Sequence, residues 1–142
     1  MPNRKQPDDK KIRILLVDDH PIVRRGIAQL IEQEIDLVVC GEAEDAPEAL
    51  KAISTLKPDL VIVDITLKDS NGIDLIKSIK ALYETLPALV VSMHDETLYA
   101  ERAIRAGARG YVMKQEAAEK VLIAIRQILR GEIYLSNKSV KS

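Results

Sequence analysis

Polar side chains that could handle a phosphoryl group follow four short apolar runs of the sequence. Asp18 and Asp19 follow the first of these runs, and Asp64 follows a run of valine, isoleucine and leucine. Ser92 and Lys114 come directly after two later runs. In an open parallel sheet the ligand crevice lies outside the carboxyl ends of the strands, so these side chains would converge there. Three carboxylates, one hydroxyl and one ammonium group at a single sheet edge are the parts of a metal-assisted phosphoryl-transfer site.

The spacing of apolar residues predicts alternating strands and helices that would position these side chains. The predicted strands cover residues 12–17, 37–40, 60–64, 88–91 and 110–113. Their apolar character is continuous rather than alternating, which is typical of strands buried on both faces. Apolar residues at helical spacing follow each strand, most regularly between Ala118 and Leu129. Alternating units of this kind predict an α/β fold, doubly wound, with a parallel sheet and helices on both faces.

The composition is that of one small globular domain. The chain has 142 residues, of which 46% are apolar and 30% are charged. A net charge of −1 gives no bulk attraction to nucleic acid or to anionic membranes. The four tyrosines are the only aromatic side chains of the Phe, Trp and Tyr class, which argues against a base-stacking surface. The single cysteine, Cys40, excludes an intrachain disulfide and fits a reducing compartment.

The sequence shows no sign of a membrane segment or a signal peptide. No apolar stretch approaches the roughly 18 residues that a membrane-spanning helix needs. The first eleven residues are polar and charged, without the apolar middle of a signal peptide. We therefore expect a cytoplasmic protein without a membrane partner.

The order of these motifs resembles the receiver domain of bacterial two-component response regulators. The resemblance rests on the run Leu-Leu-Val-Asp18-Asp19, on Asp64 and Ser92, and on the run Tyr111-Val-Met-Lys114. It implies a flavodoxin-like receiver fold with a five-stranded sheet in the order 2-1-3-4-5. The residues from Ala106 to Lys114 and the ending Gly131-Glu-Ile-Tyr-Leu-Ser136 look most like the LuxR/NarL class of transcriptional regulators. In that class a linker and a helix-turn-helix domain follow the receiver.

This resemblance divides the chain into three parts. Residues 1–11 are predicted to be a flexible tail, residues 12–131 the receiver, and residues 132–142 the start of a linker. The last segment has no room for a helix-turn-helix, so DNA would be bound only through a domain absent from this chain. A naturally stand-alone receiver is the alternative, and the LuxR/NarL-like ending argues against it.

The resemblance assigns roles to the acidic residues. Asp64 would accept a phosphoryl group from a sensor histidine kinase. Asp19 and Asp64 would bind Mg²⁺ directly, Asp18 would bind it through water, and the backbone carbonyl of Thr66 would add a ligand. Adjacent carboxylates repel one another without a cation, and Mg²⁺ takes oxygen ligands. Considered alone, Asp18 could instead cap the helix that follows the strand.

The other site residues would neutralise the phosphoryl group and report its presence. Lys114 would contact a phosphate oxygen, and Ser92 would donate its hydroxyl once the following loop closes. Tyr111 is expected to swing between exposed and buried positions as Ser92 moves, although core packing explains a lone tyrosine equally well. The resemblance implies a switch that takes part in its own Mg²⁺-dependent phosphorylation and dephosphorylation, rather than an enzyme. It allows a phosphorylation-dependent homodimer, and places the kinase contact at Ile22 and Val23.

Two histidines lie near the predicted site, and the chain departs from the family pattern at two positions. His20 and His94 have no partner at ligand spacing, so we expect His20 to cap the first helix and His94 to be exposed near the pocket mouth. Lys68 stands where receivers usually have a proline. Gln115 stands where many have a cis proline, and a trans bond is expected because a cis bond before another residue costs about 3–4 kcal/mol.

Two other functions share part of this pattern. A haloacid-dehalogenase-like phosphatase also forms an aspartyl phosphate at a strand end, but that family needs a second Asp two residues later, where this chain has Thr66. An interaction module that has lost phosphorylation is a further alternative, and the intact acidic set argues against it.

Overall fold

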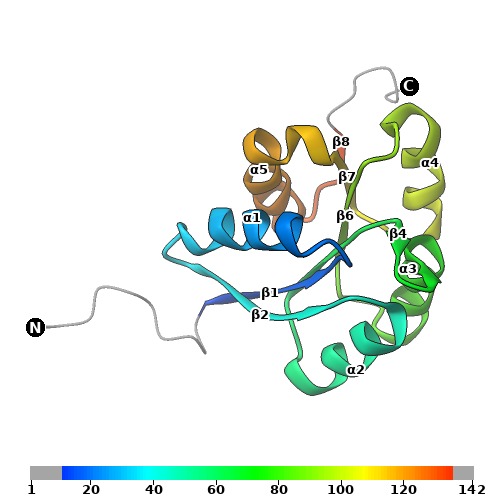
Figure 1. Cartoon of the computed structure of the whole chain (residues 1–142), viewed down its shortest axis with the longest axis horizontal. Coiled ribbons are helices and arrows are strands. Elements are labelled where there is room, and N and C mark those ends of the chain that lie inside the picture. The colour runs from blue at the N-terminus through cyan, green and yellow to red at the C-terminus, as the bar shows by residue number, and fades with distance from the viewer. Residues whose placement is uncertain (1–10, 136–142) are drawn as a thin grey trace, which may run out of the picture.

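Six parallel strands form the sheet at the centre of the structure, a computed structural model that describes residues 11–135 (Figure 1). The strands are β1 (Ile12–Val17), β2 (Leu37–Ala43), β3 (Leu60–Val63), β6 (Ala88–Ser92), β7 (Gly110–Met113) and β8 (Tyr134–Leu135). Their order across the sheet is β2-β1-β3-β6-β7-β8. The first five in chain order are therefore arranged as 2-1-3-4-5, which confirms the predicted doubly wound fold.

The predicted count of five strands was too low, because β8 adds a sixth. It lies in the segment 132–142, which was predicted to be the start of a linker. Tyr134 and Leu135 pair in parallel with Gly110 and Tyr111 of β7, and both pack partly buried against the core. Without β8, the outer backbone groups of β7 would form an unpaired sheet edge. Two residues are too few to show a strand pattern in a sequence, so the pairing could not be predicted.

Most of the predicted tail at 1–11, and the predicted linker from residue 136 onward, fall outside the described residues.

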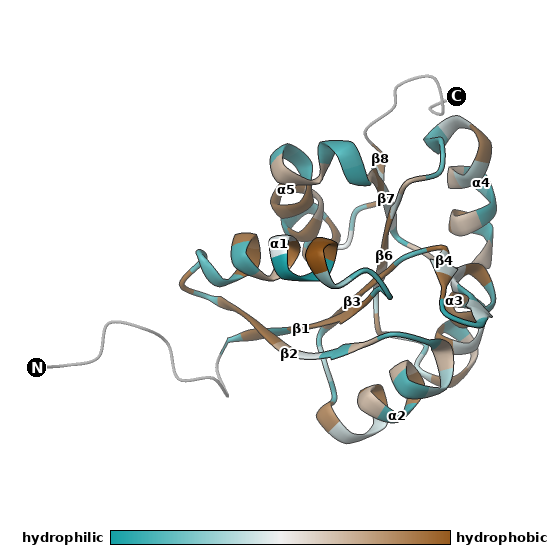
Figure 2. Ribbon diagram, in the orientation of Figure 1, coloured by the Kyte–Doolittle hydropathy of each residue, from teal (hydrophilic) through white to brown (hydrophobic). Residues whose placement is uncertain are grey.

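Five helices within residues 11–135 cover the two faces of the sheet (Figure 1). They are α1 (Pro21–Glu32), α2 (Ala46–Leu56), α3 (Gly72–Leu82), α4 (Glu96–Ala106) and α5 (Ala117–Leu129). Helices α1 and α5 pack on one face and α2, α3 and α4 on the other, so each face has its own apolar core. Figure 2 shows that most of the sheet is hydrophobic, whereas the helices carry both hydrophobic and hydrophilic residues. None of the described helices is long and apolar enough to cross a membrane.

Local signals fix the starts and ends of these helices. The Asp45 carboxylate accepts a hydrogen bond from the Glu48 N–H at 2.9 Å, and the Asp95 carboxylate accepts one from the Thr97 N–H at 2.8 Å. Such caps satisfy amide groups that no helical carbonyl reaches. Lys57 adopts a left-handed conformation, with φ 52°, and ends α2 before Pro58. These residues fix the starts of α2 and α4 and the end of α2.

The turn-rich loop after β3 forms a short antiparallel hairpin of β4 (Thr66–Leu67) and β5 (Ser70–Asn71). Lys68, which replaces the usual proline, lies exposed in its turn. Gly72 follows at the start of α3, where a Cβ atom would collide with the backbone oxygen of Asp64. The glycine thus lets α3 begin directly against the strand end that carries Asp64.

Candidate functional site

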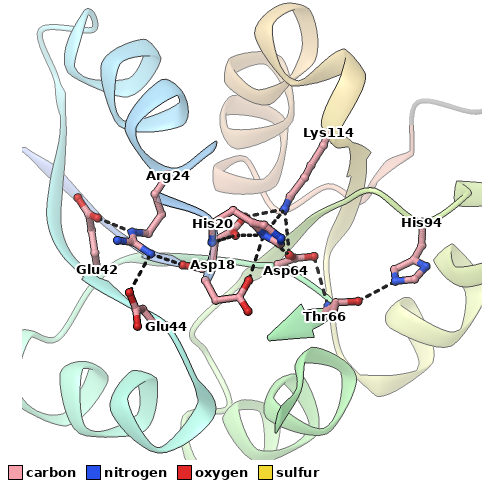
Figure 3. A network of polar contacts seen from close by, with 10 residues as sticks. Asp18, His20, Arg24, Glu42, Glu44, Asp64, Thr66, His94 and Lys114 are labelled. Atoms are coloured by element: carbon pink, nitrogen blue, oxygen red, sulfur yellow. Dashed lines mark hydrogen bonds and ion pairs between the residues drawn. The ribbon is translucent and has the colours of Figure 1, made fainter. Parts of the chain in front are cut away.

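Three nearly buried side chains from the ends of three strands meet in an ion-paired cluster (Figure 3). Asp18 follows β1, Asp64 follows β3, and Lys114 follows β7 as the first residue of the short 3₁₀ helix η2 (Lys114–Glu116). Lys114 Nζ lies 3.0 Å from Asp64 Oδ2 and 3.0 Å from Asp18 Oδ2. Only 5% of the Lys114 side chain, 6% of Asp18 and 2% of Asp64 are exposed, so solvent screens these charges weakly.

The imidazole ring of His20 lies over the same cluster. Its Nδ1 is 2.8 Å from Asp18 Oδ1, 3.0 Å from Asp19 Oδ1 and 3.6 Å from Asp64 Oδ2. The same nitrogen is 3.2 Å from Lys114 Nζ. The expectation that His20 lacks a partner at ligand spacing is therefore wrong.

The backbone conformation at His20 explains the error. His20 occupies the N-cap position of α1, as predicted, but its side chain makes no capping hydrogen bond. Its extended backbone instead lets both the backbone N–H and the ring approach Asp18 Oδ1, each at 2.8 Å. The contact between the Asp18 and His20 side chains depends on this backbone conformation, which the sequence spacing does not reveal.

One carboxylate oxygen of the cluster has no hydrogen-bond donor. Asp19 Oδ1 is buried and accepts no hydrogen bond among the described residues, because His20 Nδ1, although 3.0 Å away, does not have the geometry of a hydrogen bond to it. Ligand atoms of Asp18, Asp19, His20 and Asp64 all lie within 4.8 Å of one another. A buried oxygen without a donor, beside two further carboxylates, fits a divalent cation that takes oxygen ligands.

Burial also controls the ionisation of Asp64. Burial raises the pKa of the Asp64 carboxyl, and the neighbouring Asp18 carboxylate raises it further. The hydrogen bond and the positive charge of Lys114 lower the pKa but do not cancel the effect of burial. A bound divalent cation would favour the ionised carboxylate strongly, because its charge would be the largest in the pocket.

A side-chain contact links the acidic cluster to the loop after β6. Thr66 N–H donates to Asp64 Oδ1 at 3.3 Å, and Thr66 Oγ1 lies 2.8 Å from His94 Nε2 (Figure 3). The Thr66 side chain is exposed, whereas His94, which was expected to be exposed, is partly buried. Its ring packs 4.7 Å from the ring of Tyr99, which accounts for the lost exposure.

Ser92 and Tyr111 belong to a second group, joined through the backbone of His94. The His94 N–H donates to Ser92 Oγ at 3.1 Å, and the Tyr111 hydroxyl donates to the His94 carbonyl at 2.9 Å. Both Ser92 and Tyr111 are fully buried. Burial raises the pKa of Tyr111 to about 12, against a smaller lowering by the Ser92 hydroxyl. In the hydrogen bonds of residues 11–135, Ser92 therefore joins Tyr111 and His94 rather than the ion-paired cluster.

The backbone after Lys114 has the predicted geometry. The described residues contain no cis peptide bond, so the Lys114–Gln115 bond is trans. Lys114 reaches Asp18 and Asp64 without a cis proline behind it.

Comparison with known proteins agrees with this architecture. The response regulator receiver domain model matches residues 14–126. The nitrate/nitrite response regulator protein NarL of Escherichia coli (strain K12) is 35% identical over 125 residues, which are 87% of this chain and 57% of NarL. The crystal structure of a LuxR-family two-component response regulator from Aurantimonas sp. SI85-9A1 has a TM-score of 0.86 and 37% identity, and the match covers 92% of this chain and 94% of that one.

A receiver in the non-phosphorylated state is also similar. The receiver domain of the stress response regulator RcsB from Escherichia coli has a TM-score of 0.82 and 28% identity, over 89% of this chain and 99% of that one. The chain spans less than two thirds of the length of the curated relatives it matches, between 56% and 63%.

These matches decide between the functions considered above. They lend no support to a haloacid-dehalogenase-like phosphatase. Receiver domains are phosphoacceptor switches rather than classical enzymes, partner with sensor histidine kinases, and generally bind Mg²⁺ at an acidic pocket. The receiver family model matches most of this chain, and the carboxylates that follow β1 and β3 surround the lysine that follows β7. The chain therefore belongs to the response regulator receiver domain family, in its LuxR/NarL class.

Proposed function

We propose that Asp64 accepts a phosphoryl group from a sensor histidine kinase and that the reaction depends on Mg²⁺. The observation that carries the proposal is the meeting of Asp18, Asp64 and Lys114 at 3.0 Å, beside the donor-free oxygen of Asp19. Asp64 lies at the end of the central strand β3 and contacts Lys114, His20 and the Thr66 N–H at once. Asp18 also contacts Lys114 and a backbone N–H, so the feature that sets Asp64 apart is its place on β3, between the strands that lead to Asp18 and to Ser92.

The residues divide the chemistry between them. One carboxylate oxygen of Asp64 attacks phosphorus, the new O–P bond forms as the P–N bond of the phosphohistidine breaks, and the released imidazole takes up a proton. Mg²⁺ held by Asp19 and Asp64, through water by Asp18, and by the Thr66 carbonyl would neutralise the phosphoryl oxygens. Lys114 moves its ammonium group from the carboxylates to a phosphoryl oxygen.

The switch uses the second group of residues. Ser92 donates its hydroxyl to the phosphoryl group, which withdraws it from the His94 N–H. That movement changes the support of the Tyr111 hydroxyl, because His94 is bonded to both residues. The surface of α4, β7 and α5 then differs between the two states.

Partners follow from the family. The exposed Ile22 at the start of α1, with Val23, forms the contact with the sensor histidine kinase. The relatives include transcriptional regulators, so the output is transcription, with DNA bound by a domain outside this chain and with a phosphorylation-dependent homodimer as the active state.

Intact-mass measurement with acetyl phosphate tests the phosphoacceptor. With Mg²⁺ the chain should gain one phosphoryl group, and with EDTA it should gain none. Asp64→Asn should abolish the gain, whereas Asp74→Asn, an exposed aspartate in the first turn of α3, should label like the wild type. Asp19→Asn should raise the Mg²⁺ concentration needed. Wild-type labelling of Asp64→Asn would refute the assignment.

Amide NMR with fluoroberyllate tests the switch. The phosphate mimic should shift resonances from Ser92 to Val112 more than those around Leu50 in α2. Shifts confined to the pocket, with α4 unchanged, would show an acceptor that is not coupled to the output surface.

A further inference from the structure

Arg24 lies in the first turn of α1, beside the acidic cluster and next to Glu42 and Glu44, with only 15% of its side chain exposed (Figure 3). Its Nε donates to Glu42 Oε1 at 2.6 Å. Its Nη1 donates to the backbone carbonyl of Asp18 at 2.6 Å and lies 3.6 Å from Glu44 Oε2. The guanidinium group thus connects α1, the end of β2 and the turn that carries the acidic pair.

The hydrogen bond to the Asp18 carbonyl constrains the position of Asp19. This carbonyl belongs to the planar peptide group that joins Asp18 to Asp19, so its direction fixes where the Asp19 backbone begins. The Asp18 N–H, on the other side of the residue, donates to the Ala43 carbonyl at 3.0 Å. Asp18 is therefore held on both sides, by β2 and by Arg24.

Asp19 depends on this backbone constraint more than its neighbours do. The Asp18 carboxylate is held by the His20 N–H at 2.8 Å and by Lys114 at 3.0 Å. Asp19 Oδ1 accepts no hydrogen bond among the described residues. Apart from the 3.0 Å contact with His20 Nδ1, the direction in which the Asp19 carboxylate faces is therefore set by the turn.

Glu42 and Glu44 keep the guanidinium group away from the acidic cluster. A positive side chain that turned toward Asp19 would compete with a cation for its carboxylate. The short bond from Arg24 Nε to Glu42 holds the planar group on the β2 side. Arginine suits this task because it donates in two fixed directions at once, which a lysine ammonium on one flexible stem does not.

We propose that Arg24, held by Glu42, is a positioning residue for the divalent cation: it fixes the Asp18–Asp19 turn so that the free oxygen of Asp19 is directed at the metal. This rests on the proposed Mg²⁺-dependent function of the same pocket. Residues that orient metal ligands from behind change metal affinity on the order of tenfold or more when removed.

The sign of the effect separates positioning from simple electrostatics. Removing a positive charge near an acidic pocket would by itself strengthen Mg²⁺ binding. Positioning predicts the opposite for Arg24→Gln, a rise in the Mg²⁺ dissociation constant on the order of tenfold. Arg24→Lys keeps the charge but loses the paired bonds, so it should also weaken binding. Glu42→Gln should weaken binding less, since the bond to Asp18 survives.

Calorimetric titration of the full chain with MgCl₂ measures these constants. Arg25→Gln is the matched control: it removes the same charge from the adjacent exposed residue and should leave affinity unchanged or slightly stronger. Thermal unfolding in EDTA checks that each variant is folded. If Arg24→Gln does not fold, the Mg²⁺ dissociation constants of Arg24→Lys and Glu42→Gln test the proposal in its place. In acetyl phosphate labelling, the Mg²⁺ concentration for half-maximal rate should rise, while the rate at saturating Mg²⁺ should stay near that of the wild type.

Two results would overturn the proposal, and they differ from a failure of the proposed function. Positioning would be excluded if Arg24→Gln and Arg24→Lys bound Mg²⁺ as tightly as the wild type. It would also be excluded if the labelling rate at saturating Mg²⁺ fell while the Mg²⁺ affinity stayed unchanged. If wild-type chain bound no Mg²⁺, the proposed function would fail. Metal-free amide NMR would then decide on Arg24, because positioning requires Arg24→Lys to shift the Asp19 resonance more than the Thr66 resonance.

Discussion

Two groups of residues at the carboxyl edge of the sheet are held in place by different forces. Asp18, Asp64 and Lys114 are held by charge, through ion pairs of 3.0 Å in a pocket that excludes most water. Ser92 and Tyr111 are held by packing and by two hydrogen bonds to the His94 backbone. The first group should respond to a cation and to pH. The second should be indifferent to both until the tyrosine itself ionises.

This difference fits the two tasks of a receiver. A charged group with an unsatisfied oxygen is ready for a metal and a phosphoryl group without rearrangement of its backbone. A packed ring held by one hydrogen bond can have two discrete arrangements, as packed cores are bistable rather than continuously deformable. The contact between Thr66 and His94 at 2.8 Å joins the two groups, so a change in the first can reach the second.

The largest expected effect comes from removing the cation of the charged group. Lys114→Met should cost about 3 kcal/mol of unfolding free energy in EDTA, because two buried carboxylates lose their partner. Saturating Mg²⁺ should restore most of the loss, since the ion binds only the folded pocket. Urea unfolding with and without Mg²⁺ measures both quantities. Lys120→Met, which breaks the exposed pair with Glu116 at 3.5 Å, is the control and should lose far less.

Much of the fold follows from short-range signals. The strand ends that deliver Asp64 and Lys114 depend on local sequence and were predicted correctly, and the caps at Asp45 and Asp95 are equally local. The position of the His20 ring depends on one backbone turn, and β8 gains its stability only by pairing with β7.

Arg24 shows why the rest could not be predicted. Its partners are a backbone carbonyl six residues earlier and a glutamate 18 residues later on a neighbouring strand. No periodicity brings these groups together, because the contact exists only once β2 lies beside β1. The sequence therefore identifies the groups that carry charge more readily than those that orient them.

Neutralising Asp64 should raise the free energy of unfolding, whereas removing Lys114 should lower it. Because burial raises the pKa of Asp64, the folded chain binds this proton more tightly than the unfolded chain. Its ionised form therefore opposes folding, and stability falls as pH rises from the unfolded pKa near 4 through the higher folded pKa. Asp64→Asn should be about 1 kcal/mol more stable than the wild type at neutral pH in EDTA.

The pH dependence supplies the check on this prediction. The advantage of Asp64→Asn should shrink as the pH falls below the folded pKa of Asp64, where the wild-type carboxyl is neutral as well. Asp74→Asn, at an exposed position, should show neither the gain nor its pH dependence. An Asp64→Asn chain less stable than the wild type at neutral pH would mean that its pairing with Lys114 outweighs burial.

Tyr111→Phe should probe the packed group without disturbing its volume. Loss of the hydrogen bond to the His94 carbonyl should cost about 1 kcal/mol, equally with Mg²⁺ and with EDTA. Burial raises the pKa of Tyr111 to about 12, so stability from the neutral phenol is lost as pH rises from about 10 to about 12. Alkaline absorbance titration should show a component near pH 12 that Tyr111→Phe removes and Tyr99→Phe retains.

The smallest effect is expected at a charged site that lies away from the pocket. Arg126 of α5 donates to both oxygens of Asp36, at 2.6 and 2.8 Å, and to Glu34 at 2.9 Å, and so ties α5 to the loop between α1 and β2. About a third of each side chain is exposed, 32% for Arg126 and 36% for Asp36, so solvent screening reduces the value of these bonds. Arg126→Met should therefore cost only about 0.5 kcal/mol, and about 1 M salt should remove most of that difference. The hydrogen bond from Arg126 lowers the pKa of Asp36, so its contribution to stability is present above the unfolded pKa near 4 and is lost as pH falls through the lower folded value.

Urea unfolding of Arg126→Met in EDTA and in Mg²⁺ completes the comparison with Lys114→Met. Both variants remove one cation from a pair of carboxylates, but Mg²⁺ should rescue only Lys114→Met. Rescue of Arg126→Met to the same extent would show that the ion stabilises the chain generally rather than through the pocket at Asp64.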